Sequence, residues 1–290
     1  MRWDGFAALD WSGAAGERHH GIAVATCRPG EEAPTLVRPG HLWSRQEALD
    51  WTLRTAASGA WLIGFDLSPA LPFVDRDTYF PGWAESPADA RGLWRLVERL
   101  CAKEPDLGAS CFADHPEASR HFRRPGGRLG DLFEAGRGRL REVERAQRDG
   151  PQRLNPYSCF NLVGAAQVGK SSLSGMRLYQ RLDGRVPLWP FDPHPSSGSV
   201  VVEIYTTIAV RAAQILTGRS KIRNGETLDR VLQALGSAPH APLAHYDDHA
   251  TDALATAAWL RRVADEKALW SPPRLTPVLA ATEGWTFGVP

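Results

Sequence analysis

The 290-residue sequence lacks an excess of charge of either sign. Its 34 Lys and Arg residues stand against 33 Asp and Glu residues, which gives a formal net charge of +1. A protein that attracts nucleic acid with its whole surface carries a strong positive charge. Any nucleic-acid partner must therefore be bound by a local basic patch.

Three other signals are missing from the sequence. The cysteines are scattered, without the close spacing of zinc ligands: Cys27, Cys101, Cys111 and Cys159. No stretch approaches the roughly 20 apolar residues that span a bilayer. The first ten residues include Arg2 and Asp4, unlike a signal peptide. We therefore expect a cytoplasmic protein with reduced thiols and no membrane partner.

Length and composition are those of an ordinary globular protein. The sequence is 43% hydrophobic and 23% charged, close to the usual averages. A chain of this length can bury a full core as one large domain or two modest ones. We see no internal repeats.

The N-terminal part of the sequence predicts strands and one helix. Three apolar segments with short connections suit an antiparallel meander: residues 6–10, 20–27 and 35–43. Ser44 and Glu47 have the spacing of a capping box, which predicts a helix that starts there. Residues 61–66 follow as a wholly apolar strand that suits the centre of a sheet.

The rest of the chain divides at a long irregular segment. We interpret residues 1–68 and 199–266 as the core of one domain, residues 69–198 as an insertion, and residues 267–290 as a surface wrap. The insertion holds a predicted helix at 89–103. After it, the core resumes with the predicted elements: a buried strand at 200–205 and helices at about 207–216, 226–235 and 247–265.

Three carboxylates follow or interrupt apolar strands: Asp10, Asp66 and Glu203. Burying an unpaired carboxylate costs several kcal/mol or forces its protonation. Each has a structural alternative, since a strand-terminal Asp can cap a turn and an Arg from the insertion could pair with Glu203. As a set, they favour a functional site.

The last predicted helix begins with more acids. Asp248 and Asp252 lie four residues apart, so they share a face, and His249 lies beside them. Asp247 suits the helix N-terminus by its charge alone. Converging carboxylates repel one another, and Mg²⁺ or Mn²⁺ would neutralise them. Two such ions about 4 Å apart can activate water and stabilise a leaving oxygen in phosphodiester cleavage.

The order of these elements resembles the RNase H-like fold of RuvC-type resolvases, transposases and predicted nucleases. The sequence is most similar to an uncharacterised bacterial and archaeal family of predicted RNase H-like nucleases. The resemblance is carried by Ala-Leu-Asp at 8–10, Ile-Gly-Phe-Asp-Leu-Ser-Pro-Ala-Leu-Pro at 63–72, Val-Glu-Ile-Tyr at 202–205 and Asp-His-Ala-Thr-Asp-Ala at 248–253.

The resemblance implies an α/β fold with a mixed sheet, in which three antiparallel strands precede parallel ones and helices flank both. It implies a metal-dependent nuclease or other phosphodiesterase, with Mg²⁺ or Mn²⁺ held by Asp10, Asp66 and Asp252. Glu203 would be a further ligand or a positioning acid, since its strand falls later than usual. Asp248 or His249 would assist, the latter as a proton carrier. DNA, RNA and small nucleotides all remain open as substrates.

A different signal lies inside the insertion. Residues 164–171, Gly-Ala-Ala-Gln-Val-Gly-Lys-Ser, match the phosphate-binding P-loop, which would make the protein a nucleotide-binding phosphotransferase. Residues 171–175 are poor helix material, however, and the later run at 186–192 holds two prolines, which disfavour a central strand. A weaker alternative is that Gly169, Lys170 and Ser171 contact a phosphate of the substrate.

Two further alternatives stay open. Asp10-Trp-Ser-Gly13 loosely fits sugar kinases and actin-like ATPases, but no second phosphate-binding turn can be placed. Arginines crowd residues 120–153, and Arg124 and Arg128 among them are candidates for phosphate contact in a protein that binds nucleic acid without catalysis. These arginines could instead pair with Glu142 and Glu144. Aromatic residues there could stack on bases or belong to the core: Tyr157, Phe160 and Trp189.

Overall fold

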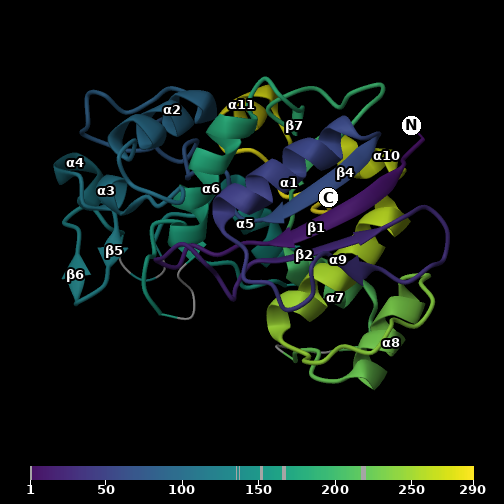
Figure 1. Cartoon of the computed structure of the whole chain (residues 1–290). Helices are drawn as coiled ribbons and strands as arrows, with labels where there is room; N and C mark the ends of the chain where they lie inside the picture. Colours follow the sequence, from purple (N-terminus) through teal and green to yellow (C-terminus); the bar gives the residue numbers. More distant parts are fainter. Residues whose placement is uncertain (1, 135, 137, 151–152, 165–167, 217–219) are drawn as a thin grey trace.

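The computed structural model describes residues 2–134, 136, 138–150, 153–164, 168–216 and 220–290. In this part of the chain, a six-stranded mixed sheet crosses the molecule with helices on both faces (Figure 1). The order of the strands across the sheet is β3-β2-β1-β4-β8-β7. They comprise β1 Gly5–Asp10, β2 Ala23–Cys27, β3 Thr35–Leu36, β4 Trp61–Asp66, β7 Leu188–Trp189 and β8 Val200–Glu203.

The strand directions confirm the predicted mixed α/β sheet. β1, β2 and β3 pair antiparallel, whereas β4, β8 and β7 continue from β1 as parallel neighbours. β3 is shorter than the predicted strand at residues 35–43, because Arg38 and Gly40 adopt positive φ values of 54° and 75° and turn the chain away. β7 lies at the sheet edge, where its flanking prolines are tolerated.

The helix after β3 starts as predicted. Ser44 Oγ accepts a hydrogen bond from the Glu47 amide at 3.0 Å, and Glu47 accepts one from the Ser44 amide at 2.9 Å. The longer helices are α1 Arg45–Ala57, α2 Ala90–Leu100, α5 Glu142–Asp149, α6 Val168–Leu182, α7 Thr206–Ala212, α8 Gly225–Ala234 and α9 Asp248–Val263. Shorter elements are α3 Ser110–Ala113, α4 Pro116–Ser119, β5 Arg123–Arg124, β6 Arg128–Leu129, α10 Lys267–Trp270 and α11 Pro277–Thr282.

Side chains alternate between two buried clusters, one on each face of the sheet. Ala7 and Leu9 of β1 belong to the cluster that α1, α2 and α6 cover. Phe6 and Ala8 belong to the cluster that α7, α8 and α9 cover. The same alternation in β4 and β8 decides which way their terminal acids point.

Segment 69–198 contributes helices, a strand and buried side chains to the core itself. It supplies α2, α6 and edge strand β7, and many of its apolar side chains fill the cluster on the α1 face. In Figure 1, α6 lies between the sheet and the group formed by α2, α3 and α4.

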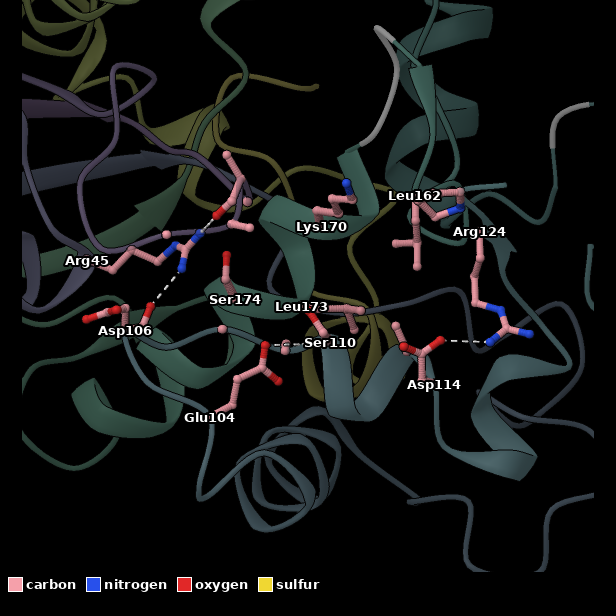
Figure 2. A pocket seen from close by; sticks show the side chains of 18 of the residues that line it. Arg45, Glu104, Asp106, Ser110, Asp114, Arg124, Leu162, Lys170, Leu173 and Ser174 are labelled. Carbon is pink, nitrogen blue, oxygen red and sulfur yellow. Dashed lines mark hydrogen bonds and ion pairs between the residues drawn. The ribbon is translucent and has the colours of Figure 1, made fainter. Parts of the chain in front are cut away.

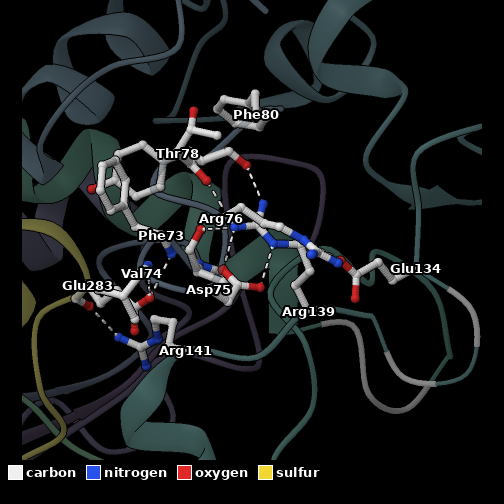
Figure 3. Close-up of polar contacts among 12 residues, drawn as sticks. Phe73, Val74, Asp75, Arg76, Thr78, Phe80, Glu134, Arg139, Arg141 and Glu283 are labelled. Carbon is white, nitrogen blue, oxygen red and sulfur yellow. Dashed lines mark hydrogen bonds and ion pairs between the residues drawn. The ribbon is translucent and has the colours of Figure 1, made fainter. Parts of the chain in front are cut away.

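Buried Arg139 ties the 72–79 loop of this segment together (Figure 3). Its guanidinium donates to both carboxylate oxygens of Asp75, at 2.9 and 2.6 Å. The same group donates to the carbonyl oxygens of Pro72, Thr78 and Tyr79 at 2.6–2.9 Å. The loop is thereby held in a fixed position next to the C-terminal tail.

The predicted surface wrap at residues 267–290 is wrong for its end, since residues 282–287 and 289 are buried, whereas residues 267–281 lie mostly at the surface. Trp285, Phe287 and Val289 are buried in the cluster on the α9 face. The Phe287 amide donates to the Glu203 carbonyl at 2.9 Å, so the tail pairs with the end of β8. The end of the tail therefore completes the core, because its apolar side chains pack into this cluster and Thr286 between them is buried as well.

All four cysteines are free thiols, as the sequence predicts. Among the described residues, every helix is too short or too polar to cross a lipid bilayer.

Candidate functional site

Two predicted acids lie side by side at the carboxyl end of the sheet. β1 and β4 are parallel, and Asp10 and Asp66 occupy the same register position. By alternation with Ala8 and Gly64, both side chains point to the α9 face. Asp10 is 9% exposed and Asp66 is partly buried. The structure thus brings together two carboxylates that are 56 residues apart in the sequence.

Helix α9 adds further predicted residues to this pair. Asp247 is its N-cap and accepts a hydrogen bond from the Ala250 amide, which is the structural role predicted for it. His249 Nδ1 lies 2.8 Å from Asp10 Oδ2. One turn later, Asp252 is 5% exposed and faces the sheet. Asp248 forms an ion pair with Arg223, and its charge also acts on Lys221 and Asp252.

Two cations come close to these acids in the described part of the chain. Lys221 Nζ lies 2.6 Å from Asp252 Oδ2, and His249 contacts Asp10. The pKa of Lys221 is raised, since the negative charge of Asp252 outweighs partial burial, which acts in the opposite direction. The hydrogen bond to Asp10 raises the pKa of His249 despite its burial. The surrounding carboxylates therefore favour the protonated forms of both side chains.

The acids themselves show mutual repulsion. Burial and the charge of Asp10 raise the pKa of Asp66 well above its ordinary value, although the Thr206 hydroxyl donates to it at 3.0 Å. Burial also raises the pKa of Asp252, while Lys221 acts to lower it. Burial and the closeness of the other carboxylates therefore both disfavour the charged forms of these two acids.

Glu203 lies apart from this group. Its register partner is Phe65, not Asp66, so alternation points it to the opposite face of the sheet. There Arg141 binds both carboxylate oxygens, at 2.5 and 2.8 Å, and the Thr286 hydroxyl donates at 2.7 Å. This is the alternative in which an arginine of segment 69–198 pairs with Glu203. Both carboxylate oxygens of Glu203 are therefore already bound, and Glu203 is not among the metal ligands that we propose.

A pocket of about 220 Å³ opens beside the acids. Asp10 and Asp66 line one part of it, and the Arg141–Glu203 pair lines another. Tyr157 and Tyr205 add aromatic surface to its wall. We call this the carboxylate pocket. Of the aromatic residues singled out in the sequence, Phe160 and Trp189 are buried in the core, whereas Tyr157 is 37% exposed.

The P-loop-like motif falls partly outside the described residues, since these omit 165–167. The prediction that residues 171–175 form a poor helix was wrong: they lie within α6, whose apolar side chains are buried, and tertiary packing outweighs weak propensity. The Gly169 amide donates to the Asn161 carbonyl, and a Cβ there would lie 2.2 Å from the Cys159 carbonyl oxygen. Close packing therefore explains Gly169. Lys170 and Ser171 lie in the first turn of α6.

The arginines of residues 120–153 are largely paired with acids. Arg124 and Arg128 both bind Asp114, and Arg120 binds Asp131. Arg141 also pairs with Glu144, and Arg145 lies 3.8 Å from Glu142, as the structural alternative predicts. Arg137 lies outside the described residues.

Sequence analysis missed two residues of the site, Lys221 and Thr206. It also missed Arg45, which lines a larger pocket next to the site. Lys221 and Thr206 contact Asp252 and Asp66, and no sequence pattern marks either of them. Arg45 lines a second pocket and had a recognisable signal. It begins α1, where the helix dipole disfavours a positive charge.

Comparisons with protein-family models, curated proteins and solved structures gave no match for this chain.

Proposed function

We propose that the protein is a metal-dependent phosphodiesterase of the RNase H-like type, with Asp10, Asp66 and Asp252 as its central acids. The observation that carries this proposal is the in-register pair of Asp10 and Asp66, faced by Asp252 from α9. The resemblance noted in the sequence places the same three residues together. Strand order and the acid-bearing last helix are compatible with it.

The chemistry of the donors fits Mg²⁺ or Mn²⁺. Hard divalent ions prefer carboxylate oxygens, and burial together with the neighbouring charge of Asp10 raises the pKa of Asp66, which a bound cation would lower again. Within the described chain, no three His, Cys, Asp or Glu side chains form a ready-made metal site. Lys221 Nζ lies 2.6 Å from Asp252 Oδ2 and pairs with this carboxylate. Binding of an ion would require Lys221 to release this carboxylate.

The protein's own residues have distinct roles in this proposal. Asp10, Asp66 and Asp252 would hold the ions, which activate water and stabilise the leaving oxygen. His249 donates through Nδ1 to Asp10 and is half exposed, so its Nε2 could carry a proton to or from the substrate. Thr206 orients Asp66 through its hydroxyl.

Cleavage of single- and double-stranded DNA and RNA oligonucleotides with Mn²⁺ tests the proposal. We expect cutting by the wild type that EDTA stops and that Asp10→Asn and Asp66→Asn abolish. Loss of even an outer-shell partner of a metal costs roughly 10- to 100-fold. Calorimetric titration with Mn²⁺ should show weaker binding in both variants.

The matched control is Asp247→Asn on the same helix. Asn caps helices as well as Asp does, so this variant should retain both cutting and Mn²⁺ binding. Wild-type protein that neither cuts any of these substrates nor binds Mn²⁺ would contradict the proposal. Equal cutting by the wild type and Asp10→Asn would contradict it as well.

A second candidate is a nucleotide-binding phosphotransferase. It is favoured by one observation, that the P-loop-like motif leads into helix α6. The residues before the motif do not belong to the main sheet in the described structure, since Asn161 makes only an isolated bridge with Arg123. ATP hydrolysis that is lost in Lys170→Ala would support this candidate.

A further inference from the structure

A second and larger pocket adjoins the carboxylate pocket. It has a volume of about 360 Å³ and is lined by the loop that follows β1, residues 13–16, and by the first turns of α6 (Figure 2). Val168 and Ser171 of α6 line the carboxylate pocket, whereas Lys170 and Ser174 line this one. The first turns of one helix therefore form a common wall of the two pockets.

Buried Arg45 is the most informative residue of the second pocket. It is 2% exposed, yet it forms no ion pair with any described carboxylate. Its guanidinium donates to the carbonyl oxygens of Ser12 at 2.9 Å and Asp106 at 2.7 Å, and also to that of Ala14. Three of its five N–H groups are thus used, and two remain. Burial lowers the pKa of Arg45 to about 10 even though Asp106 and Glu104 favour its charge.

Lys170, like Arg45, forms no ion pair in the described part of the chain. It belongs to α6 and lies between Arg45 and Arg124 in Figure 2. The loop after β1 packs tightly against this turn, since a Cβ on Gly13 would lie 2.1 Å from the backbone carbonyl carbon of Lys170. The position of Lys170 relative to the end of β1 is therefore set by close packing.

On the far side of the pocket, two arginines share a single acid. Arg124 and Arg128 lie 2.8 and 3.3 Å from the same oxygen of Asp114. Arg124 Nε is buried and has no hydrogen-bond partner among the described residues. This trio carries a net charge of +1, and it presents unused N–H groups next to the pocket.

The acids of the pocket do not cancel these cations. The lining includes four basic residues and three acids, Glu104, Asp106 and Asp114, a net charge of +1. Glu104 accepts hydrogen bonds from the amides of Ser110 and Cys111, at 3.0 and 2.9 Å, so its charge is already satisfied. Asp106 leaves one carboxylate without a side-chain partner among the described residues, but the free donors on the four basic residues outnumber it, which suits an anionic ligand.

We propose that this pocket binds a phosphate group of a nucleic-acid strand or nucleotide whose neighbouring phosphodiester lies at the carboxylate pocket. Arg45, Lys170 and the Arg124–Arg128 pair supply the donors, and guanidinium groups match phosphate geometry. This inference rests on the proposed function for the identity of the substrate, but binding in this pocket does not require metal. The pocket would be the second place, besides the carboxylate pocket, at which the protein binds its substrate.

Calorimetric titration in EDTA tests the inference. The probes are one short single-stranded oligonucleotide with and without a 5′-phosphate, and inorganic phosphate. Lys170→Ala and Arg128→Ala are the test variants, because Arg45 also anchors two loops. The control is Arg54→Ala, which removes an exposed arginine from the last turn of α1. Asp10→Asn is included because it should abolish cutting but not this binding.

We expect each test variant to bind the oligonucleotide about 10- to 100-fold more weakly, because each loses a hydrogen bond between a charged side chain and a phosphate. Each should also lower the slope of log K against log salt by about 0.7, as expected for one lost contact with single-stranded nucleic acid. Stronger binding of the 5′-phosphorylated strand would identify a terminal phosphate. Equal binding of the two strands would identify an internal phosphodiester.

The inference is overturned if Lys170→Ala and Arg128→Ala bind like Arg54→Ala, or if the wild type binds none of the probes. Metal-dependent cutting with unchanged binding in both variants would retain the proposed function and reject this pocket. Normal binding that depends on Lys170 and Arg128, without any cutting, would retain the pocket and reject the proposed function.

Discussion

Glu203 and Asp66 are both acids at the ends of neighbouring parallel strands, yet their surroundings differ. Glu203 faces Arg141, which binds it through two hydrogen bonds and also pairs with Glu144. Asp66 faces Asp10, and its one described hydrogen-bond donor is the uncharged Thr206 hydroxyl. A buried acid with an arginine stabilises the fold as a pair, whereas two adjacent acids remain available for a ligand.

The first prediction concerns Arg141. Arg141→Met should lower the free energy of unfolding by about 3–5 kcal/mol, because it leaves Glu203 and Glu144 buried without a charge partner. Urea denaturation at pH 7 measures this difference. The control is Arg148→Met, which removes an exposed arginine paired with Asp149 and should cost at most about 1 kcal/mol. Equal stability of the two variants would show that Arg141 is not needed to compensate these acids.

At the scale of the elements, α6 and the C-terminal tail both show tertiary packing outweighing a weak local signal. Neither has a strong local signal, since α6 begins with glycine and serines and the tail is short and rich in turns. Each is held by packing: α6 against α2 and α1, and the tail against β8 and α9. Weak intrinsic propensity is overridden when enough apolar surface is buried.

The second prediction follows from the tail. Phe287→Ala should lower the free energy of unfolding by about 3–5 kcal/mol, as expected for a fully buried aromatic side chain. Thermal and urea denaturation measure it. Val278→Ala in α11 serves as the control, because Val278 is 57% exposed and a surface change is usually worth less than about 0.5 kcal/mol. Equal effects would mean that the tail is a surface wrap after all.

For the whole molecule, two buried histidines make stability depend on pH. Burial, together with the charge of Arg45, lowers the pKa of His19 to about 4. Burial, together with Arg139 and Arg120, lowers the pKa of His121 to about 4. Between pH 4 and 6.5 the unfolded chain therefore binds more protons than the folded one, so these residues destabilise the fold as the pH falls through this window.

The third prediction tests this effect. The free energy of unfolding of the wild type should fall between pH 7 and pH 4.5, and His121→Phe should reduce that fall by up to about 3 kcal/mol. Phe is suitable because His121 packs against the rings of Phe80 and Phe160. His20→Gln, at an exposed position, should leave the pH dependence unchanged. A fall that is the same in all three proteins would contradict the assignment to His121.

The sequence by itself determined the strands β1 and β4, the capped start of α1 and helix α9, whereas the mixed α/β sheet was implied by the family resemblance. Apolar alternation, capping spacing and helical periodicity are local properties, so they can be recognised without the fold. Asp10 and Asp66 could be singled out because each ends an apolar run, and Asp252 because it lies one helical turn after Asp248.

Only the tertiary structure decided the environment of those acids. The register between β4 and β8 points Glu203 away from Asp66, and its partner Arg141 comes from 62 residues earlier in the chain. Lys221 lies in a loop and contacts Asp252, and Arg45 and Lys170 line the same pocket. These outcomes depend on which distant residues meet and on a one-residue register, and no local pattern encodes either of them.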